Sequence, residues 1–344
     1  MQILENYDLT KLNTFGIKAE AKYFTEINKE EDIPSLFESE QFKNNERLFL
    51  GGGSNVLFTK DFDGIVILNK IKGIEVINES KEDVWIKAYG GEIWHDLVSF
   101  SVGHEYWGIE NLSWVPGTVG AAPMQNIGAY GAELKDTLVS VEAYDISNGE
   151  KVIFQNNECK LGYRDSIFKN VAKGKYFISA IVLKLSKVEK KNITYRALKD
   201  YFEKNNINPE TIKDISDAVI EIRKSKLPDP KIIGNAGSFF KNVFVEKKEL
   251  DILLEKYPEL PYFEEENVFK IPAGWLIEEC GPARSTISWK GYRVGNVGVH
   301  DKQALVLVNH GGATGEEIKD LALQIIDSVK QKFGLILNPE VNFV

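Results

Sequence analysis

Three consecutive glycines after a short apolar run carry the clearest chemical signal in the sequence. Residues 47–50 read as a strand, and Gly51-Gly52-Gly53-Ser54-Asn55 follows at once. Glycine adopts positive φ freely, so successive N–H groups can point into one concavity that suits a phosphate or pyrophosphate. Val56 stands where a dinucleotide fingerprint has its third glycine, and no G-x-x-x-x-G-K-[ST] motif is present. The segment predicts either a phosphate-binding loop or an ordinary glycine-rich turn.

A second segment, Asn111 to Ala132, contains no Asp, Glu, Lys or Arg, although 27% of the chain is charged. At that average usage such a run arises by chance in about one window in a thousand. Its prolines and glycines exclude a membrane-spanning helix. Small side chains leave backbone N–H and C=O groups free to contact a large ligand, so we expect either a ligand-lining loop or a buried loop under others. We call it the charge-free loop.

Composition limits the function classes. The 344 residues carry a formal net charge of −9, which argues against a general binder of nucleic acid or anionic membranes. Cys159 and Cys280 are far apart and form no C-x-x-C, so neither a disulfide framework nor a zinc site is expected. Four histidines show no ligand spacing and are read as structural, with a place near the site as the alternative for His300, which precedes Asp301. The charged start and the lack of a long apolar run predict a cytoplasmic protein.

These segments need elements to position them. Hydrophobic periodicity predicts a β-α-β start, a β-rich middle with one helix, and a helical stretch at 195–225. Leu227-Pro228-Asp229-Pro230 breaks that stretch and predicts a domain boundary. The predicted strands lie at 23–27, 47–50, 65–68, 74–77, 84–88, 139–145, 151–154, 176–185, 238–244, 304–308 and 335–337. The predicted helices lie at 31–42, 93–100, 247–256, 273–279 and 315–333, the last with Thr314 and Glu317 as a capping box.

Six motifs follow one another in the order that they have in the UDP-N-acetylenolpyruvoylglucosamine reductase family, namely GGGSNVL, PGTVGAAPMQNIGAYG, GYRDS, KLPDPKIIGNAGSFFKN, AGWLIEECG and NPEVNF. The segment Asn192 to Leu198 resembles the tyrosine-bearing insert of the family's longer subgroup. Two positions depart from the family pattern. Val243 stands where a proline is frequent, and Asn342 where a basic residue is common. The first departure concerns a local turn, and the second a contact near the reacting carboxylate.

The resemblance implies an α+β fold. It has an FAD-binding domain of the vanillyl-alcohol-oxidase (PCMH) type in two subdomains, residues 1–71 with 334–344 and residues 72–227, and a C-terminal α/β substrate domain at 228–333. FAD would be bound non-covalently, because the glycine segment contains no histidine. The implied cofactor-binding residues are Gly51, Gly52, Gly53, Ser54, Asn55, Val56, Pro116, Gly117, Thr118, Gly120, Ala121, Asn126, Ile127, Gly128 and Ala129.

The resemblance also implies the reaction. NADPH would reduce the flavin, which would deliver a hydride to C3 of the enolpyruvyl group of the nucleotide sugar and give UDP-N-acetylmuramate for peptidoglycan. Developing negative charge at C2 needs fixed positive charge and a proton donor. Arg164 matches the family's anion-stabilising arginine, Ser238 its general acid and Glu340 its assisting carboxylate. The alternative for each residue is structural. An arginine beside an aspartate commonly forms a salt bridge, a serine commonly donates to a backbone carbonyl, and a glutamate after a proline is commonly solvated.

For the anionic substrate we expect contacts from Tyr130, Tyr195, Arg223, Lys226, Asn242, Lys270 and Gln303. A monomer without metal, nucleic acid or membrane partner is expected. Two rival functions remain at this point. One is an FAD oxidase of the same fold, which would consume oxygen without NADPH, and the other is a non-catalytic flavin or nucleotide binder.

Overall fold

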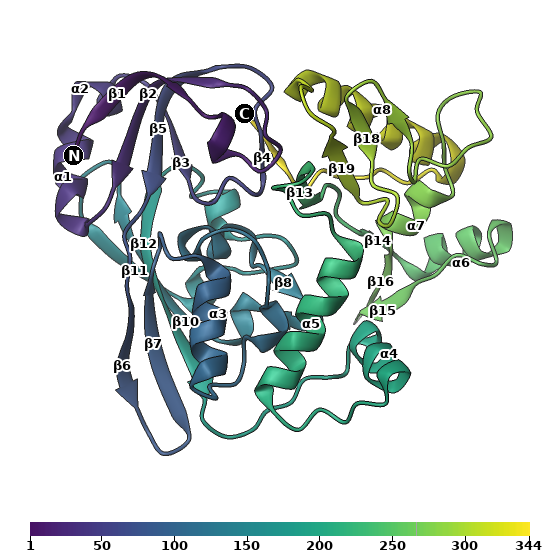
Figure 1. Cartoon of the computed structure of the whole chain (residues 1–344), viewed down its shortest axis with the longest axis horizontal. Helices are drawn as coiled ribbons and strands as arrows, with labels where there is room; N and C mark the ends of the chain where they lie inside the picture. Colours follow the sequence, from purple (N-terminus) through teal and green to yellow (C-terminus); the bar gives the residue numbers. More distant parts are fainter. Residues whose placement is uncertain (266) are drawn as a thin grey trace. The chain divides into compact units, whose positions relative to one another are not determined.

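A computed structural model describes residues 1–265 and 267–344, and the chain forms two compact units (Figure 1). Unit 1 comprises Met1–Tyr7, Glu20–Gly53 and Phe62–Ser225, and unit 2 comprises Asp8–Ala19, Ser54–Asp61 and Lys226–Val344. The chain therefore passes from one unit to the other within the predicted glycine loop, between Gly53 and Ser54. The division expected from the sequence, into two FAD-binding subdomains and a substrate domain, stays a prediction. Among the described residues, no helix combines the length and apolarity needed to cross a bilayer.

The first sheet of unit 1 has the order β1-β2-β5-β3. Its strands are β1 (Ile3–Asp8), β2 (Glu20–Ile27), β5 (Phe62–Asn69) and β3 (Glu46–Leu50). Strand β5 pairs in parallel with β2 and β3 and is buried along almost its whole length, which explains its continuous apolar run. Strand β3 ends at Leu50, where the glycine segment begins, as the sequence predicts.

The helix predicted at 31–42 is wrong as a single element. Two short helices replace it, α1 (Ile33–Glu38) and α2 (Glu40–Lys43). Ser39 between them adopts an extended conformation, with ψ of 143°, and its hydroxyl accepts the Phe42 N–H at 3.3 Å as the N-cap of α2. A serine that caps a new helix interrupts the old one, although the apolar periodicity runs through it.

The second sheet of unit 1 is antiparallel, with the order β11-β10-β12-β7-β6. Its strands are β6 (Ile74–Glu79), β7 (Asp83–Tyr89), β10 (Leu138–Asp145), β11 (Lys151–Gln155) and β12 (Tyr176–Ser186). Helix α3 (Trp94–Gly103) buries Trp94, Leu97 and Val98 in the same core as the inner residues of this sheet. All five strands and the helix were predicted from periodicity.

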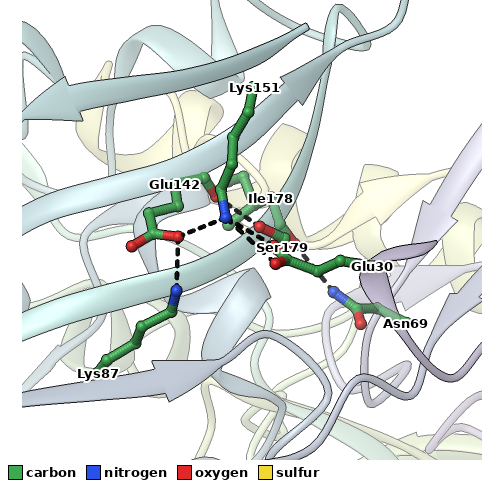
Figure 2. A network of polar contacts seen from close by, with 7 residues as sticks. All are labelled: Glu30, Asn69, Lys87, Glu142, Lys151, Ile178 and Ser179. Atoms are coloured by element: carbon green, nitrogen blue, oxygen red, sulfur yellow. Dashed lines mark hydrogen bonds and ion pairs between the residues drawn. The ribbon is translucent and has the colours of Figure 1, made fainter. Parts of the chain in front are cut away.

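A network of polar contacts joins the second sheet to the end of β5 and to the turn after β2 (Figure 2). Glu142 on β10 pairs with Lys87 and Lys151 at 2.8 Å each, and Lys151 reaches Glu30 at 3.0 Å. Nearby, Asn69 at the end of β5 donates from Nδ2 to the Ile178 carbonyl at 2.9 Å. Burial alone would lower the pKa of Lys151, but its carboxylate partners raise it above the usual value. The ion pairs therefore fasten the turn after β2 to the second sheet, and the Asn69 bond joins the end of β5 to β12.

The helical stretch at 195–225 consists of two helices, α4 (Arg196–Asn205) and α5 (Ile212–Lys226). Asn206 ends α4 in the left-handed conformation, with φ of 52°. One core contains the apolar faces of both helices together with Trp107. Helix α5 matters for the site because it carries Arg223.

Unit 2 contains a four-stranded sheet, β13-β19-β18-β17, and a three-stranded sheet, β14-β16-β15. The strands are β13 (Gly234–Ser238), β14 (Val243–Val245), β15 (Phe263–Glu265), β16 (Val268–Ile271), β17 (Arg293–Val294), β18 (Val297–Val299) and β19 (Val306–Asn309). The helices are α6 (Lys247–Lys256), α7 (Ala273–Glu278) and α8 (Gly315–Phe333). The predicted capping box of α8 is present, with Thr314 and Glu317 each accepting the other's backbone N–H.

The strand predicted at 335–337 is wrong. Leu335 and Leu337 are buried in alternation, but no strand partner pairs with them in the part of the chain that the structure describes. Alternating burial shows that one face of the segment is covered. It does not show that a neighbouring strand is hydrogen-bonded to it. The closing strand is instead β20 (Asn342–Phe343), which pairs in parallel with β4 (Val56–Leu57) directly after the glycine loop.

Candidate cofactor and substrate site

Within unit 1, the glycine segment and the charge-free loop meet backbone to backbone. A Cβ on Gly51 would lie 2.5 Å from the Thr118 Oγ1, and one on Gly52 would lie 3.0 Å from the Gly117 Cα. A side chain at Gly51 would displace the Thr118 hydroxyl or the loop that carries it, and a side chain at Gly52 would press on the Gly117 backbone. The Thr118 hydroxyl is buried without a hydrogen-bond partner among the described residues, which is costly unless a bound group supplies one. The cradle therefore fits a cofactor held by backbone groups.

Two helices fix the charge-free loop. The Trp94 backbone N–H of α3 donates to the Gly117 carbonyl at 3.0 Å, and its indole N–H donates to the Leu112 carbonyl at 3.1 Å. On the other side, the Ser113 and Ser216 hydroxyls are 2.8 Å apart and buried, which fastens the loop to α5. These bonds replace the regular ladder that a loop rich in glycine and proline cannot form.

The remaining loop residues predicted to hold the cofactor divide into two groups. Asn126 is fully buried and its side chain is committed to the protein, since Nδ2 donates to Glu133 and to the Gly162 carbonyl while Oδ1 accepts the Lys135 N–H. A Cβ on Gly120 would meet Gly90 and not the glycine segment. Ala121 lies against Gly51, whereas Pro116 is exposed and Ile127, Gly128 and Ala129 are half-buried. Their contacts with a cofactor stay predictions.

Two arginines from distant parts of the sequence gather in unit 1. Arg223 donates from Nε to the Trp114 carbonyl at 3.1 Å and has the Tyr130 hydroxyl as a hydrogen-bond partner. Arg164 donates from Nη2 to the Gly128 carbonyl at 2.8 Å. Burial lowers the pKa of Arg223, Tyr130 opposes this, and the nearby Arg164 lowers it further. Two guanidinium groups so close attract an anion.

The backbone around these arginines is strained. Trp114, Tyr130 and Arg164 have φ of 58°, 50° and 52°, in the left-handed region that large side chains seldom adopt. Such residues persist only where their surroundings fix them, and they gather at functional sites. Burial also raises the pKa of the Tyr130 phenol, so it remains a hydrogen-bond donor at neutral pH.

The tyrosine-bearing insert lies against Tyr130. The Tyr195 ring makes an edge-to-face contact with the Tyr130 ring at 5.5 Å, and Tyr195 is 47% exposed. Asn192 donates to the Gly131 carbonyl at 2.9 Å, while Asn111 donates to the carbonyls of Tyr130 and Asn192. The structure thus brings Tyr130 and Tyr195 together, as the proposed substrate contacts require.

Within unit 2, Ser238 and Glu340 lie on adjacent segments. The Glu340 N–H donates to the Phe239 carbonyl at 2.7 Å, one residue beyond Ser238 at the end of β13. Asn55 donates from Nδ2 to the Glu340 carbonyl at 3.3 Å. Asn342 returns two bonds to the Asn55 carbonyl, from its backbone N–H at 3.1 Å and from its side-chain amide at 3.0 Å. Asn55, at the end of the glycine segment, and the segment Glu340–Asn342 therefore hold each other through these hydrogen bonds, which we call the clamp.

Sequence reasoning missed Asn235. Its buried side chain accepts the Gly237 N–H at 2.9 Å and donates to the carbonyls of Pro228 and Ile233. Gly237 has φ of 67°, and the register between β13 and β19 shifts before Ser238. Asn235 thereby fixes the turn that presents Ser238. Its position within GNAGS is the only sequence cue, and that cue does not reveal the carbonyls that it binds.

Three of the other substrate residues predicted in unit 2 have partners within the protein. Asn242 accepts the Ala273 N–H at 3.1 Å, and Gln303 accepts the Leu305 N–H at 3.3 Å. Lys270 pairs with Glu265, and Lys226 is an exposed residue at the end of α5. Val243 begins β14 and pairs with Ile271, and the strand predicted at 238–244 is divided in the structure between the end of β13 and the start of β14. Substrate contacts of these residues stay predictions. Among the described residues, no group of three His, Cys, Asp or Glu could hold a metal ion.

Comparisons with known proteins agree with this arrangement. Residues 21–154 match an FAD binding domain, and residues 229–344 match the C-terminal domain of UDP-N-acetylenolpyruvoylglucosamine reductase. Enzymes of that name from Flavobacterium johnsoniae and Chromobacterium violaceum are 45% and 43% identical to the chain. The alignments cover 100% of both chains in the first case, and 99% of this chain and 98% of the relative in the second.

The crystal structure of the Thermus caldophilus UDP-N-acetylenolpyruvylglucosamine reductase has the same fold, with a TM-score of 0.66 over 99% of this chain and 98% of that one, at 20% identity. The expected FAD-binding domain followed by a C-terminal substrate domain is therefore confirmed as the fold class. The chain belongs to the UDP-N-acetylenolpyruvoylglucosamine reductase family and is an FAD-dependent oxidoreductase.

Proposed function

We propose that the protein reduces UDP-N-acetylenolpyruvoylglucosamine to UDP-N-acetylmuramate with NADPH, as a cytoplasmic monomer that supplies a peptidoglycan precursor. The observation that carries the proposal is the clamp in unit 2. A predicted proton donor, Ser238, and a predicted carboxylate, Glu340, lie on adjacent segments, and the latter is tied to the glycine segment through Asn55. A rigid backbone arrangement of this kind holds catalytic groups within small tolerances.

FAD would be held by the backbone of Gly51–Asn55 and by the Thr118 hydroxyl and its neighbours, and when bound it supplies the hydride chemistry. The protein's part is to exclude bulky side chains from that cradle, so that its backbone can approach the cofactor closely. The left-handed conformation of Gly53 and Gly117, with φ of 62° and 109°, serves the same purpose.

Arg164 stabilises the negative charge that develops on the enolpyruvyl carboxylate. Its guanidinium remains charged at every accessible pH and meets a carboxylate through two parallel N–H bonds. Its bond to the Gly128 carbonyl fixes the side chain before substrate arrives, so little reorganisation is needed during the reaction.

Ser238 donates a proton to C2 of the substrate. A hydroxyl is a weak acid in water, but it can protonate a carbanion, which is a much stronger base. Glu340 assists this transfer, and the Asn235 turn keeps the serine in place. Arg223 and Tyr130 bind the anionic nucleotide sugar with Tyr195, and Lys226, Asn242, Lys270 and Gln303 complete the proposed substrate contacts.

The test separates the reaction into its two halves. Enzyme reconstituted with FAD and desalted should bleach when NADPH is added without air. The yellow colour should return when the enolpyruvyl nucleotide is added, with one equivalent of UDP-N-acetylmuramate formed. Colour that returns only with oxygen would favour an oxidase, and stable colour without bleaching would favour a non-catalytic flavin binder.

A further inference from the structure

His95 lies at the start of α3 and its ring contacts the charge-free loop. The Nδ1 atom accepts the Trp114 N–H at 3.1 Å, although the two residues are 19 positions apart in the chain. Trp114 is one of the strained residues, with φ of 58°. An unusual backbone conformation needs outside support, and the imidazole supplies it at the peptide nitrogen.

The other end of the same residue holds Arg223. The Trp114 carbonyl accepts the Arg223 Nε–H at 3.1 Å, and the Lys224 ammonium lies 5.8 Å from the centre of the Trp114 ring. Trp114 therefore connects an imidazole on α3 to a guanidinium on α5 through its own backbone. A change at the His95 end alters the orientation of the carbonyl at the Arg223 end, because one residue's φ and ψ position both groups.

The groups that face His95 favour its neutral form. Burial lowers the pKa of the ring, Asp96 on the same helix raises it, and Lys224 and Arg223 on α5 lower it again. The charge-free loop, the third element against the ring, contributes no Asp, Glu, Lys or Arg, and its one tyrosine, Tyr130, is neutral at these pH values because burial raises its pKa. Since Nδ1 is an acceptor, the proton of the neutral ring is assigned to Nε2.

We propose that neutral His95 is a positioning residue for Arg223, acting through the Trp114 backbone, and that protonation of the ring weakens binding of the anionic substrate. Protonated Nδ1 would present an N–H to the Trp114 N–H, and two donors repel each other. The hydrogen bond that supports the strained residue would be lost. The inference rests on the proposed function, because there Arg223 binds the nucleotide sugar.

The experiment measures substrate affinity by calorimetry on the oxidised, FAD-loaded protein between pH 7.5 and pH 5. Wild type should bind the enolpyruvyl nucleotide about tenfold more weakly at the acid end. His95→Asn should bind like wild type at pH 7.5, because an amide oxygen can replace Nδ1 as the acceptor, and should lose the acid weakening. His95→Ala should bind about fivefold more weakly at pH 7.5, with no acid weakening beyond that of His95→Asn.

His104→Asn is the matched control. His104 follows α3, is exposed, and contacts Phe100 and Tyr106 but not the loop. Its variant should keep the full acid weakening. The inference is overturned if His95→Asn keeps the wild-type pH profile or if His95→Ala binds as tightly as wild type.

A structural readout separates this inference from the proposed function. Nitrogen-detected NMR of the histidine rings should show His95 as the Nε2–H tautomer with a pKa below 6.5. A ring protonated on Nδ1 at pH 7.5 contradicts the inference even if the enzyme turns over. Conversely, wild-type protein that neither binds nor reduces the nucleotide sugar contradicts the proposed function, while the tautomer can still be read.

Discussion

Arg164 and Arg223 show how single residues prepare the site in unit 1. Each guanidinium is held by a backbone carbonyl, from Gly128 and from Trp114 respectively, and Arg223 also has the Tyr130 hydroxyl as a hydrogen-bond partner. Arginine is suited to this because its planar fork can satisfy a carbonyl and an anion at once. A lysine at either position would make one such bond at a time.

Arg164→Ala should slow reoxidation of the reduced enzyme by substrate by roughly 10²–10³-fold, the usual effect of removing one anion-stabilising donor. Bleaching by NADPH should change much less. Stopped-flow absorbance of the flavin measures both rates. Arg47→Ala is the matched control, because Arg47 also donates to backbone carbonyls, those of Phe42 and Lys43, but lies outside the proposed site. Equal slowing of both halves would contradict the role given to Arg164.

At the residue scale, the sequence allows candidate site residues to be named, but it does not reveal the hydrogen bonds that position them. Ser238, Arg164 and Glu340 could be named because ordered motifs surround them. The Asn235 turn, the Asn55–Asn342 clamp and the His95–Trp114 bond could not, since each joins a side chain to a backbone group whose place depends on the fold. Asn342 was expected to alter a contact near the reacting carboxylate, and this stays a prediction, since the structure shows its side chain bonded to the Asn55 carbonyl.

At the scale of elements, the site depends on two loops that lack side chains where they meet. Gly51→Ala would place a methyl group 2.5 Å from the Thr118 Oγ1, so either the hydroxyl or the loop must move. The variant should fold but lose at least about tenfold in FAD affinity, since every backbone donor of the cradle shifts. The absorbance ratio at 450 and 280 nm after desalting measures the retained flavin.

Gly103→Ala is the control for this prediction. A Cβ on Gly103, in the last turn of α3, meets nothing within 4 Å. Alanine there should leave flavin content unchanged and stabilise the helix by up to about 1 kcal/mol. If Gly51→Ala retains as much FAD as Gly103→Ala, the cradle is not the cofactor site.

Elements with strong local rules were predictable, and those that depend on partners were not. The capping box of α8 and the exact span of α6 follow from local sequence. The break at Ser39 and the false strand at 335–337 do not. In the first case a side chain bonds its own backbone, and in the second a buried face has no hydrogen-bonded neighbour. Hydrophobic periodicity detects which positions are buried. It cannot detect that a side chain bonds its own backbone, or whether a buried segment has a strand beside it.

At the scale of the whole molecule, unit 1 is held in part by charges that join its second sheet to the turn after β2 (Figure 2). Lys151 lies between Glu142 and Glu30, with about a third of its side chain exposed. Lys151→Met should lower the free energy of unfolding by about 1–2 kcal/mol, between the values for exposed and buried pairs. Urea unfolding measures it. Lys319→Met, which removes an exposed pair with Glu316 on α8, should cost less than about 0.5 kcal/mol.

The loss of stability caused by Lys151→Met should depend on pH, and the direction of that dependence follows from the pKa of Glu142. Burial would raise the pKa of Glu142, but Lys151 and Lys87 lower it below 4.5 overall. A carboxyl whose folded-state pKa is lowered contributes stability above its unfolded pKa and loses it as the pH falls through the folded value. The stability gap between wild type and Lys151→Met should therefore narrow below about pH 4.5. A gap that stays constant into acid would assign the loss to packing.

The central claim is that this chain supplies a proton from Ser238 to a substrate that accepts a hydride, and Ser238→Ala tests it most directly. The FAD-loaded Ser238→Ala variant should bleach with NADPH at the wild-type rate. The control is Ser285→Ala, at an exposed turn serine of the same unit, which should behave as wild type in both half-reactions. Reoxidation of Ser238→Ala by the enolpyruvyl nucleotide should be slower by about 10²–10⁴-fold, the usual contribution of a positioned acid. Reoxidation at the wild-type rate would contradict the account.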